Sequence, residues 1–282
     1  YSGSLLALLK WASAMKQFIL YTIFSNVLVL PWGLSIQGTA MGALGAASAL
    51  APRAFGKSSG PFVQRPNIIV ILTDDQGYED LSCQGHATID TPRIDQMAAE
   101  GVRFTDFYAG ASICSPARAA LLTGCWPMRL GIYMSIEGQG AGDESLNPDE
   151  YCLAEMLRDQ LGYETKILGK RHLGTRFAQE KESYGFDRWY WESDPMSTRA
   201  SQQADLAIDF INQNLSKPFF LYCAHTAPHV PIYEASYEAA VEEIDTSTGR
   251  ILDHLASVGL DNNTWVIFYS DNGPWLEKGA DG

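Results

Sequence analysis

Along the chain, runs of consecutive apolar residues alternate with segments in which apolar residues recur every three or four positions. The continuous runs are rich in β-branched and aromatic residues and predict buried strands at Asn67–Leu72, Tyr163–Leu168, Phe219–Ala224 and Trp265–Tyr269. The helical spacing predicts helices at Tyr151–Leu161, Ser197–Leu215 and Tyr233–Val258. Strands that alternate with helices predict an α/β fold.

Two further segments carry the residues typical of helix ends. Residues 91–101 begin with Thr-Pro and end with Gly, and residues 115–124 begin with Ser-Pro and end with Gly. Ser or Thr suits the N-cap, Pro the first helical position and Gly the C-terminal stop. The second helix is therefore expected to begin at Pro116, and a strand is expected over Val102–Tyr108.

Residues 1–65 differ in composition from the rest of the chain. A Met-Lys-Gln start at residue 15 precedes the apolar run 18–34, and small residues follow up to Ala-Leu-Ala at 49–51. This order resembles a secretory signal peptide, so we expect an exported (periplasmic or secreted) protein. The run also approaches the length of a bilayer span, which makes a membrane anchor the alternative. We expect a leader over 1–65, with a Pro-, Gly- and Ser-containing linker at 52–65, and one domain over 66–282.

Charge is also unevenly distributed. The formal net charge is −13, the first 65 residues contribute +5, and the remainder holds 15 basic and 33 acidic residues, which gives −18. A domain this acidic is a poor general binder of nucleic acid, so we expect no nucleic-acid partner. An anionic substrate would need local positive charge from Lys, Arg or a metal.

The chain contains five cysteines, which are Cys83, Cys114, Cys125, Cys152 and Cys223. Apart from Cys114, considered below, four remain. They allow two disulfides in an oxidising compartment, but their spacing does not define the pairing. Buried free thiols are the alternative.

Cys114 lies just before the predicted helix 115–124, where backbone N–H groups point outward and the helix dipole favours negative charge. Arg118 follows one turn later on the same face. A cysteine, N–H donors and a guanidinium therefore converge on one place, which suits a tetrahedral oxyanion. A buried structural thiol is the alternative for this pattern alone.

Two pairs of oxygen ligands follow predicted strands. Asp74 and Asp75 come after the first strand, and Asp271 and Asn272 come after the last. Open α/β sheets bind ligands at the carboxyl ends of their strands. Adjacent carboxylates repel one another unless a cation lies between them, and such hard ligands suit Ca²⁺ or Mg²⁺. Solvated turns are the alternative for both pairs.

Basic side chains follow the two other predicted strands. Alternation along an extended chain places Lys170 and His172 on one side and Arg171 on the other. A Lys beside a His can bind a sulfate oxygen and relay a proton, whereas a surface basic cluster is the alternative. His225 and His229 come next and could be zinc ligands, but no matching Cys/His set lies nearby in the sequence.

Residues 114–124 read Cys-Ser-Pro-Ala-Arg-Ala-Ala-Leu-Leu-Thr-Gly and resemble, over all eleven positions, the signature of the formylglycine-dependent (type I) sulfatases. The match is to the N-terminal catalytic domain of arylsulfatase-like members. Further family motifs follow in the expected order: Asp-Asp-Gln-Gly at 74–77, Gly-Lys-Arg-His-Leu-Gly at 169–174, Ala-Pro-His-Val-Pro at 227–231 and Ser-Asp-Asn-Gly at 270–273. Arg171 stands where the family has tryptophan. Because this position alternates away from the site, we expect altered packing or substrate fit.

The resemblance implies an alkaline-phosphatase-like α/β sandwich in which helices flank a large mixed β-sheet. It also implies that a separate maturation enzyme oxidises Cys114 to formylglycine, whose hydrate is the nucleophile that cleaves a sulfate ester. A divalent cation, Ca²⁺ rather than Mg²⁺, is implied at Asp74, Asp75, Asp271, Asn272 and residue 114 itself.

The same resemblance implies roles for the basic residues. Arg118, Lys170 and His229 stabilise the charge of the transferring sulfuryl group, and His229 or Lys170 protonates the departing alcohol. His172 assists the formylglycine hydrate. The implied substrate is a sulfated small molecule or polysaccharide.

In the family a further catalytic lysine and a smaller C-terminal subdomain follow. Lys278 lies too close to Asn272 to match that lysine, so the sequence resembles a catalytic domain truncated at its C-terminus. Three alternatives remain open: a phosphonate or phosphodiester hydrolase with the same nucleophile, an inactive calcium-binding fragment, and a hydrolase that uses unmodified Cys114 with a histidine base.

Overall fold

The computed structural model describes residues 28–29, 65–136, 145–174, 183–186, 188–190, 199–232 and 234–275. Its elements in chain order are β1 (Leu28–Val29), β2 (Asn67–Thr73), η1 (Ser82–Gln84), α2 (Pro92–Glu100), α3 (Cys114–Thr123), α4 (Leu153–Glu155), the π-helical η2 (Met156–Gln160), β3 (Glu164–Gly169), η4 (Ser183–Gly185), β4 (Arg188–Tyr190), α5 (Ala200–Gln213), β5 (Phe219–Ala224), α6 (Tyr237–Ser257), η6 (Asp261–Asn263) and β6 (Thr264–Ser270). The predicted linker, apart from Arg65, and Lys278 lie outside the described residues.

The strands form one six-stranded sheet in the order β1-β6-β2-β5-β3-β4. Every neighbouring pair is parallel except β1 and β6, which are antiparallel, so the sheet is mixed. The register pairs Leu72 of β2 with Ala224 of β5, and Thr73 of β2 with Ser270 of β6. The residues that follow these three strands therefore emerge together at one edge of the sheet.

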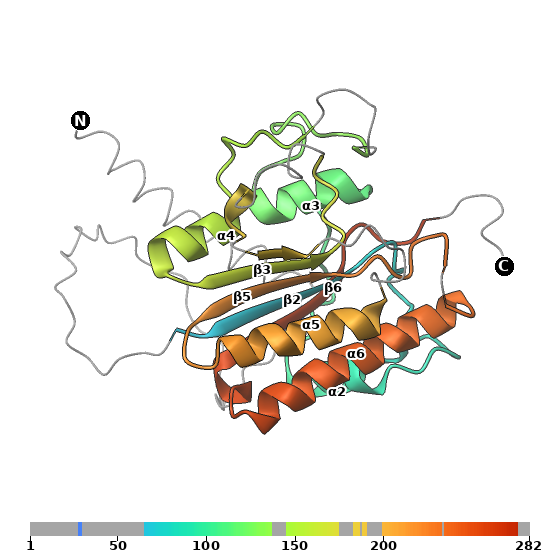
Figure 1. Cartoon of the computed structure of the whole chain (residues 1–282). Coiled ribbons are helices and arrows are strands. Elements are labelled where there is room, and N and C mark those ends of the chain that lie inside the picture. Colours follow the sequence, from blue (N-terminus) through green and yellow to red (C-terminus); the bar gives the residue numbers. More distant parts are fainter. Residues whose placement is uncertain are drawn as a thin grey trace, which may run out of the picture.

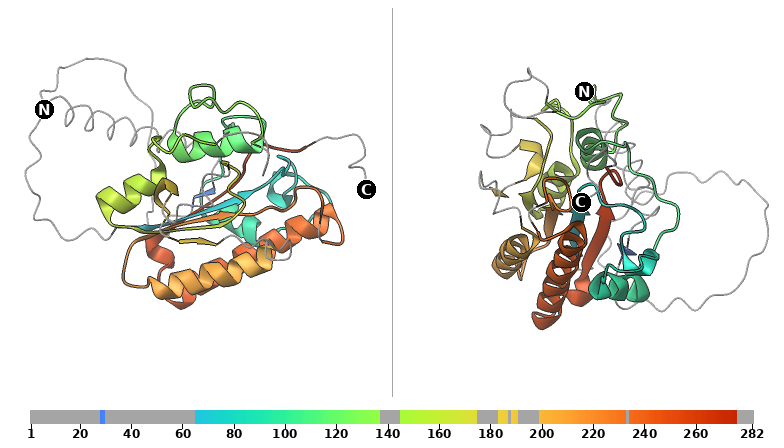
Figure 2. Two further views of the ribbon diagram at one scale, coloured as in Figure 1. Left: turned by 45° about the horizontal axis from the view of Figure 1, so that its top comes forward. Right: turned by 90° about the vertical axis from the view of Figure 1, so that its right-hand side faces the viewer.

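Helices cover both faces of the sheet (Figure 1), and the turned views of Figure 2 show the three layers. In β2, Ile69 and Ile71 pack in the core beneath α2, α5 and α6, whereas Val70 and Leu72 pack in the core beneath α3 and α4. Each of these side chains is almost completely buried, which stabilises the fold by roughly 1.5–3 kcal/mol per residue. A strand buried on both faces has no polar face, which explains why this segment is continuously apolar.

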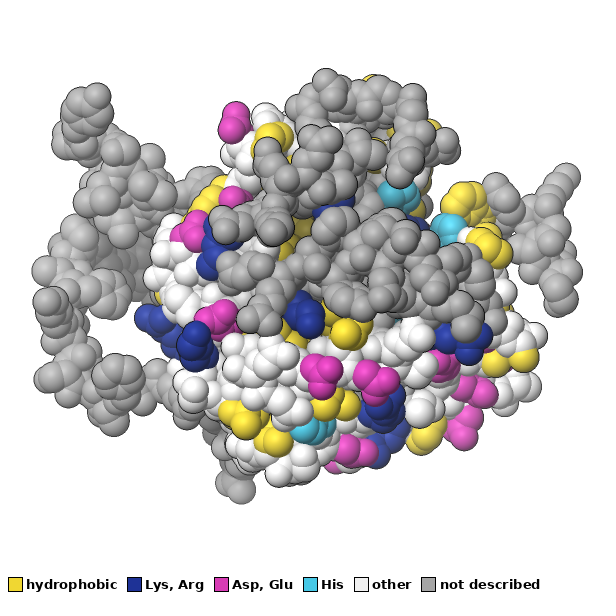
Figure 3. Space-filling view, viewed as in Figure 1, with side chains coloured by type: hydrophobic (Ala, Val, Ile, Leu, Met, Phe, Trp, Pro, Cys, Tyr) yellow, Lys and Arg dark blue, Asp and Glu magenta, His cyan; other side chains and the backbone are white. Residues whose placement is uncertain are grey.

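The surface over α5 and α6 is mixed in charge. Figure 3 shows Lys and Arg side chains interspersed with Asp and Glu along this face. Arg93 and Asp253, 2.5 Å apart, and Arg250 and Asp205 form ion pairs there. Exposed pairs of this kind contribute little stability.

The predicted elements are confirmed, with small shifts at their ends, except for the strand over Val102–Tyr108. That prediction is wrong, because only Val102 forms an isolated bridge in this segment. The ring of Phe107 packs edge-on against Tyr269, with the ring centroids 5.5 Å apart. Side-chain packing against the sheet, and not strand pairing, therefore positions this segment.

Two residues of the predicted leader lie in the sheet. Leu28 and Val29 of β1 pair with Phe268 and Ile267 of β6. The rest of the apolar run 18–34 lies outside the described residues. Among the helices of the described ranges, none combines the length and apolar character that a membrane crossing requires.

Candidate active site

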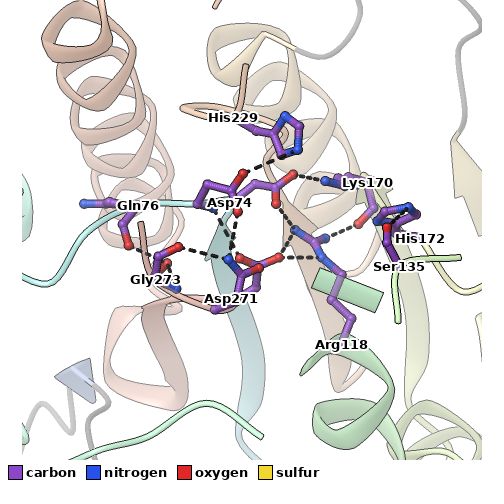
Figure 4. Close-up of polar contacts among 12 residues, drawn as sticks. Asp74, Gln76, Arg118, Ser135, Lys170, His172, His229, Asp271 and Gly273 are labelled. Atoms are coloured by element: carbon purple, nitrogen blue, oxygen red, sulfur yellow. Dashed lines mark hydrogen bonds and ion pairs between the residues drawn. The ribbon is translucent and has the colours of Figure 1, made fainter. Parts of the chain in front are cut away.

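Asp74 and Asp271 are neighbours at the carboxyl edge of the sheet (Figure 4). The backbone N–H of Asp271 donates to the carbonyl of Thr73 at 3.0 Å, and the N–H of Asp75 donates to Asp271 Oδ1 at 3.3 Å. Asp74 is 0% and Asp271 3% exposed. The parallel pairing of β2 with β6 thus brings the two predicted acidic motifs together.

Asp75 and Asn272 lie beside this pair. Asn272 Nδ2 donates to Asp75 Oδ1 at 2.7 Å, and His229 Nε2 lies 3.4 Å from Asp75 Oδ2. Asp75 has a φ of 61°, in the left-handed region that residues other than glycine seldom adopt. Such a conformation costs roughly 1–3 kcal/mol and persists where the surroundings impose it, often at functional sites.

Two cations face these carboxylates. Arg118 is completely buried, and its Nε and Nη2 contact Asp271 Oδ2 at 2.9 and 2.8 Å. Its Nη2 also lies 3.5 Å from Asp74 Oδ1, while Lys170 Nζ pairs with Asp74 Oδ2. Burial alone lowers the pKa of Arg118, but Asp271 and Asp74 outweigh it and raise that pKa above its usual value. The guanidinium is therefore permanently charged.

The pKa of Asp271 is set by burial and by these cations. Burial raises the pKa of Asp271, and the charge of Arg118 offsets part of that increase. The side chains of Arg118 and Lys170 therefore supply the positive charge that a pair of buried carboxylates requires.

Helix α3 begins at Cys114 with Ile113 as its N-cap, so the prediction of Ser115 as N-cap is wrong by two residues, and Cys114 is the first helical residue. The N–H of Ala117 donates to the carbonyl of Ile113 at 3.0 Å, which starts the helix earlier. The hydroxyl of Ser115 is taken up elsewhere, because it accepts the N–H of Ile136 at 3.0 Å. Gly124 ends the helix with a φ of 69°, as predicted.

Cys114 reaches the acidic cluster. Its Sγ and one carboxylate oxygen each of Asp74 and Asp271 all lie within 4.8 Å of one another. Burial raises the pKa of the Cys114 thiol, and nearby Lys170 offsets only part of that increase. A thiol with a raised pKa is mostly protonated at neutral pH, so a hydrolase that used unmodified Cys114 would need a base or a cation to form the thiolate.

The basic motif lies beyond the end of β3, so the alternation used to orient it does not apply. Gly169 and His172 both have positive φ, 81° and 57°, and the chain turns between them. Lys170 nevertheless points to Asp74, and His172 Nε2 lies 3.5 Å from Ser135 Oγ.

Arg171 is directed away from the acidic cluster. Its Nη2 donates to the carbonyl of Gly174 at 3.0 Å, and the residue is only 7% exposed. The alternative of an exposed basic cluster at 170–172 is therefore wrong. Burial, with the charges of Lys170 and Arg118, lowers the pKa of His172 to about 4, so its ring is neutral at pH 7.

The two histidines after β5 separate. His229 faces Asp75, and its ring packs edge-on against Trp275 with the centroids 5.6 Å apart. His225 is 1% exposed, and burial lowers its pKa to about 4. Among the described residues, His225 belongs to no group of side chains close enough to share a metal ion, whereas His229 does.

All five cysteines are within the described residues, and all are free thiols. The two disulfides that the cysteine count allows are therefore not formed, and the alternative of free thiols holds. Cys152 and Cys223 are fully buried, while Cys83 and Cys125 are half-buried.

The acidic cluster fits a divalent cation. Two sets of ligand atoms converge, one from Asp74, Cys114 and Asp271 and the other from Asp74, Asp75 and His229. Asn272 Oδ1 is buried, and no described residue donates a hydrogen bond to it. Carboxylate and amide oxygens are the ligands that a hard cation prefers, and the amide oxygen of Asn272 has no hydrogen-bond donor among the described residues.

Ser135 and Trp275 lie at the site although neither was predicted. Ser135 lies in an irregular segment and contacts His172, and Trp275 contacts His229. Ser135 follows no predicted strand, and Trp275 lies just beyond the motif at 270–273 without being part of it, so neither was singled out from the sequence.

Carboxylates at the ends of parallel strands, with two basic side chains and a helix N-terminus beside them, define an α/β protein with an acidic cluster whose side chains could hold a metal ion. The family model "Sulfatase" matches residues 66–282, and the chain belongs to this family. N-acetylgalactosamine-6-sulfatase of Mus musculus is 35% identical over 76% of this chain and 51% of its own length. Arylsulfatase G of Rattus norvegicus is 32% identical over 76% of this chain and 52% of its own length.

A solved structure extends the comparison to the fold. The crystal structure of Ps i-CgsB superposes with a TM-score of 0.68 at 28% identity, over 77% of this chain and 61% of that one. The expected alkaline-phosphatase-like α/β sandwich with a mixed sheet is thereby confirmed. The chain spans about half the length of the curated relatives it matches.

Proposed function

We propose that this chain is the catalytic part of a sulfuric ester hydrolase, with the catalytic domain over 66–282 and a leader over 1–65. One observation carries the proposal: Cys114, Asp74 and Asp271 come within 4.8 Å of one another beside the buried guanidinium of Arg118. Three segments far apart in the sequence thus supply a nucleophile position, cation ligands and an anion-binding side chain to one place.

The proposed modification and cation supply the chemistry that the unmodified side chains lack. Oxidation of Cys114 to formylglycine by a maturation enzyme would place a hydrated aldehyde there, with a hydroxyl as nucleophile. Ca²⁺, in preference to Mg²⁺, would be held by Asp74, Asp75, Asp271, Asn272 and residue 114, and would lower the pKa of that hydroxyl and bind a sulfate oxygen.

Each basic side chain has a separate role in the proposed reaction. Arg118 and Lys170, both on the acidic cluster, hold the sulfate oxygens and stabilise the charge that develops on them. His229, partly exposed on the other side of Asp75, protonates the departing alcohol. His172, neutral at pH 7, accepts a proton from the second hydroxyl of the hydrate as sulfate leaves.

A sulfated sugar is the substrate class that we propose. Its support is the name of the relative N-acetylgalactosamine-6-sulfatase and a crystal structure of Ps i-CgsB in complex with k-i-k-neocarrahexaose. We propose export to the periplasm or the exterior, with membrane anchoring by the leader as the alternative. The net charge of −18 after residue 65 is unsuited to nucleic acid.

Mass spectrometry of the peptide that holds residue 114 tests the nucleophile. The protein should be produced with a formylglycine-generating enzyme that oxidises only cysteine, and active chains should carry the aldehyde at this position. Cys114→Ser should abolish hydrolysis of an aryl sulfate, and Cys125→Ser, which changes a half-buried thiol that is not among the clustered ligands, should not. An unmodified thiol in fully active protein would contradict the proposal.

Matched substrates separate the alternatives. Faster hydrolysis of an aryl phosphonate or phosphodiester than of an aryl sulfate would identify a phosphonate or phosphodiester hydrolase. A melting temperature that rises with Ca²⁺ while no ester is cleaved would identify an inactive calcium-binding fragment.

A further inference from the structure

The loop from Asp74 to Asp80 carries two of the proposed cation ligands and an unfavourable backbone conformation. Asp75, with its φ of 61°, directs Oδ1 to Asn272 and Oδ2 to His229. An isolated loop would relax from this conformation, so other residues must hold it in place.

On one side, the end of β6 holds the loop. Ser270 Oγ donates to the carbonyl of Gln76 at 2.8 Å and accepts the N–H of Gly273 at 3.3 Å. This contact comes from the motif that also contains Asp271 and Asn272, so it ties the two acidic segments to each other.

On the other side, helix α6 holds the loop through a carboxylate. Asp80 Oδ2 accepts the N–H of Gly77 at 2.5 Å and also accepts the hydroxyl of Tyr237. The same N–H lies 3.4 Å from the Tyr237 hydroxyl. A Cβ atom at Gly77 would lie only 2.6 Å from Asp80 Oδ2, so this close approach requires glycine.

Tyr237 is a rigid donor. It is the first residue of α6, whose N-terminus is capped by Ser236 Oγ, which accepts the N–H of Ala239 at 3.2 Å. Burial and the adjacent Asp80 raise the pKa of the Tyr237 hydroxyl, so it keeps its proton at any working pH. The 21-residue helix therefore fixes the position of the donor, and through Asp80 the position of the loop.

We propose that Asp80 and Tyr237 are positioning residues for the cation of the proposed sulfatase site. Neither ligates the ion; together they hold the Asp74–Gly77 segment so that Asp74 and Asp75 present their oxygens to it. The inference rests on the proposed function, since it requires that the acidic cluster bind a divalent cation. Removing a partner that orients a metal ligand typically weakens affinity about 10–100-fold.

Calcium titration of the full chain by isothermal calorimetry tests this role. Tyr237→Phe, which removes only the hydroxyl, should raise the Kd for Ca²⁺ about tenfold, and Asp80→Asn should do so at least as strongly. Tyr163→Phe is the matched control, because its hydroxyl donates to the carbonyl of Pro66 at the opposite edge of the sheet. The control should keep the wild-type Kd.

The outcomes separate the two proposals. A wild-type Kd in Tyr237→Phe and Asp80→Asn, or loss of the folded circular dichroism spectrum in either, would overturn the positioning role alone. A wild-type chain that binds no Ca²⁺ would contradict both proposals. Binding of Ca²⁺ without sulfate ester hydrolysis would contradict only the proposed function. The Kd values of the variants and of the wild-type chain for Ca²⁺ could still be compared, so the positioning role would still be tested.

Discussion

Asp74 and Asp245 are both buried carboxylates, but their surroundings differ in kind. Asp245 of α6 accepts the N–H groups of Arg93 at 3.0 Å and Ile94 at 2.7 Å, at the start of α2. Asp74 pairs with the side chains of Arg118 and Lys170, and no backbone N–H of a described residue donates to its carboxylate.

The difference distinguishes a structural carboxylate from one that is available to a ligand. Backbone donors at a helix N-terminus are part of the fold, so Asp245 is satisfied as soon as α2 and α6 pack together. Side-chain cations are less permanent partners, because they can also bind an anion while the carboxylates bind a metal. A cluster of buried carboxylates and cations is weak support for stability and costs desolvation energy, which is consistent with a functional role.

Removing the charge of Asp74 should give the largest effect on metal binding. Asp74→Asn keeps the shape of the side chain but removes a charge shared by both ligand sets, so Ca²⁺ affinity should fall on the order of 100-fold. Calorimetric titration measures the change, with exposed Asp205→Asn as control. An unchanged Kd in Asp74→Asn would place the cation elsewhere.

Removing the guanidinium of Arg118 should give the largest effect on stability. Arg118→Met leaves Asp271 buried without its main partner, so the calcium-free free energy of unfolding should fall by about 3–5 kcal/mol. Urea denaturation measures it, and saturating Ca²⁺ should recover part of the loss by neutralising the carboxylates. Arg250→Met, which removes a surface ion pair, should cost less than about 1 kcal/mol.

Removing the side chain of Asp245 should lower stability without changing Ca²⁺ affinity. Asp245→Ala leaves two N–H groups at the start of α2 without an acceptor, so unfolding free energy should fall by about 1–2 kcal/mol. Ca²⁺ affinity should stay at the wild-type value. A weakened Ca²⁺ affinity in this variant would show that the two regions are coupled, contrary to the comparison.

The smallest expected effect is the pH dependence of stability. It comes from two buried histidines, one on each side of the sheet. The pKa values of His172 and His225 are lowered from 6.5 to about 4 in the folded chain. Between pH 6.5 and 4 the unfolded chain therefore binds more protons at these positions, so their contribution to stability falls as pH decreases through that window. NMR titration of the ring protons should show both rings neutral down to about pH 4. A midpoint near 6.5 for either would contradict the burial argument.

Local patterns were sufficient to predict most of the fold. Phe219–Ala224 is predicted and observed with the same ends, and α5 and α6 lie within their predicted segments. Periodicity reports which side chains must be buried, and helix and strand ends have local chemical markers, so neither requires knowledge of distant residues. The failed strand over Val102–Tyr108 shows the limit, because a strand also needs a partner that its own sequence does not specify.

The sequence predicted most residues of the site, but it did not predict which of them contact one another. Asp74, Arg118, Lys170 and Asp271 were all candidates from their places after strands or beside a helix start. No local pattern indicated that Arg118 would pair with Asp271, which is 153 positions away, or that Tyr237 would hold Asp80 across 157 positions. Neither Ser135 nor Trp275 belongs to one of the motifs that indicated the site.

By itself, the sequence determined which segments become strands and helices and which polar residues stand at their ends. Only the tertiary structure decided which of those residues meet, because the parallel register of β2, β5 and β6 brings their carboxyl ends to one edge. It also decided which carboxylate is satisfied by backbone and which by side-chain cations. Those outcomes depend on contacts between residues that are far apart in the sequence, and hydrophobic periodicity carries no information about such contacts.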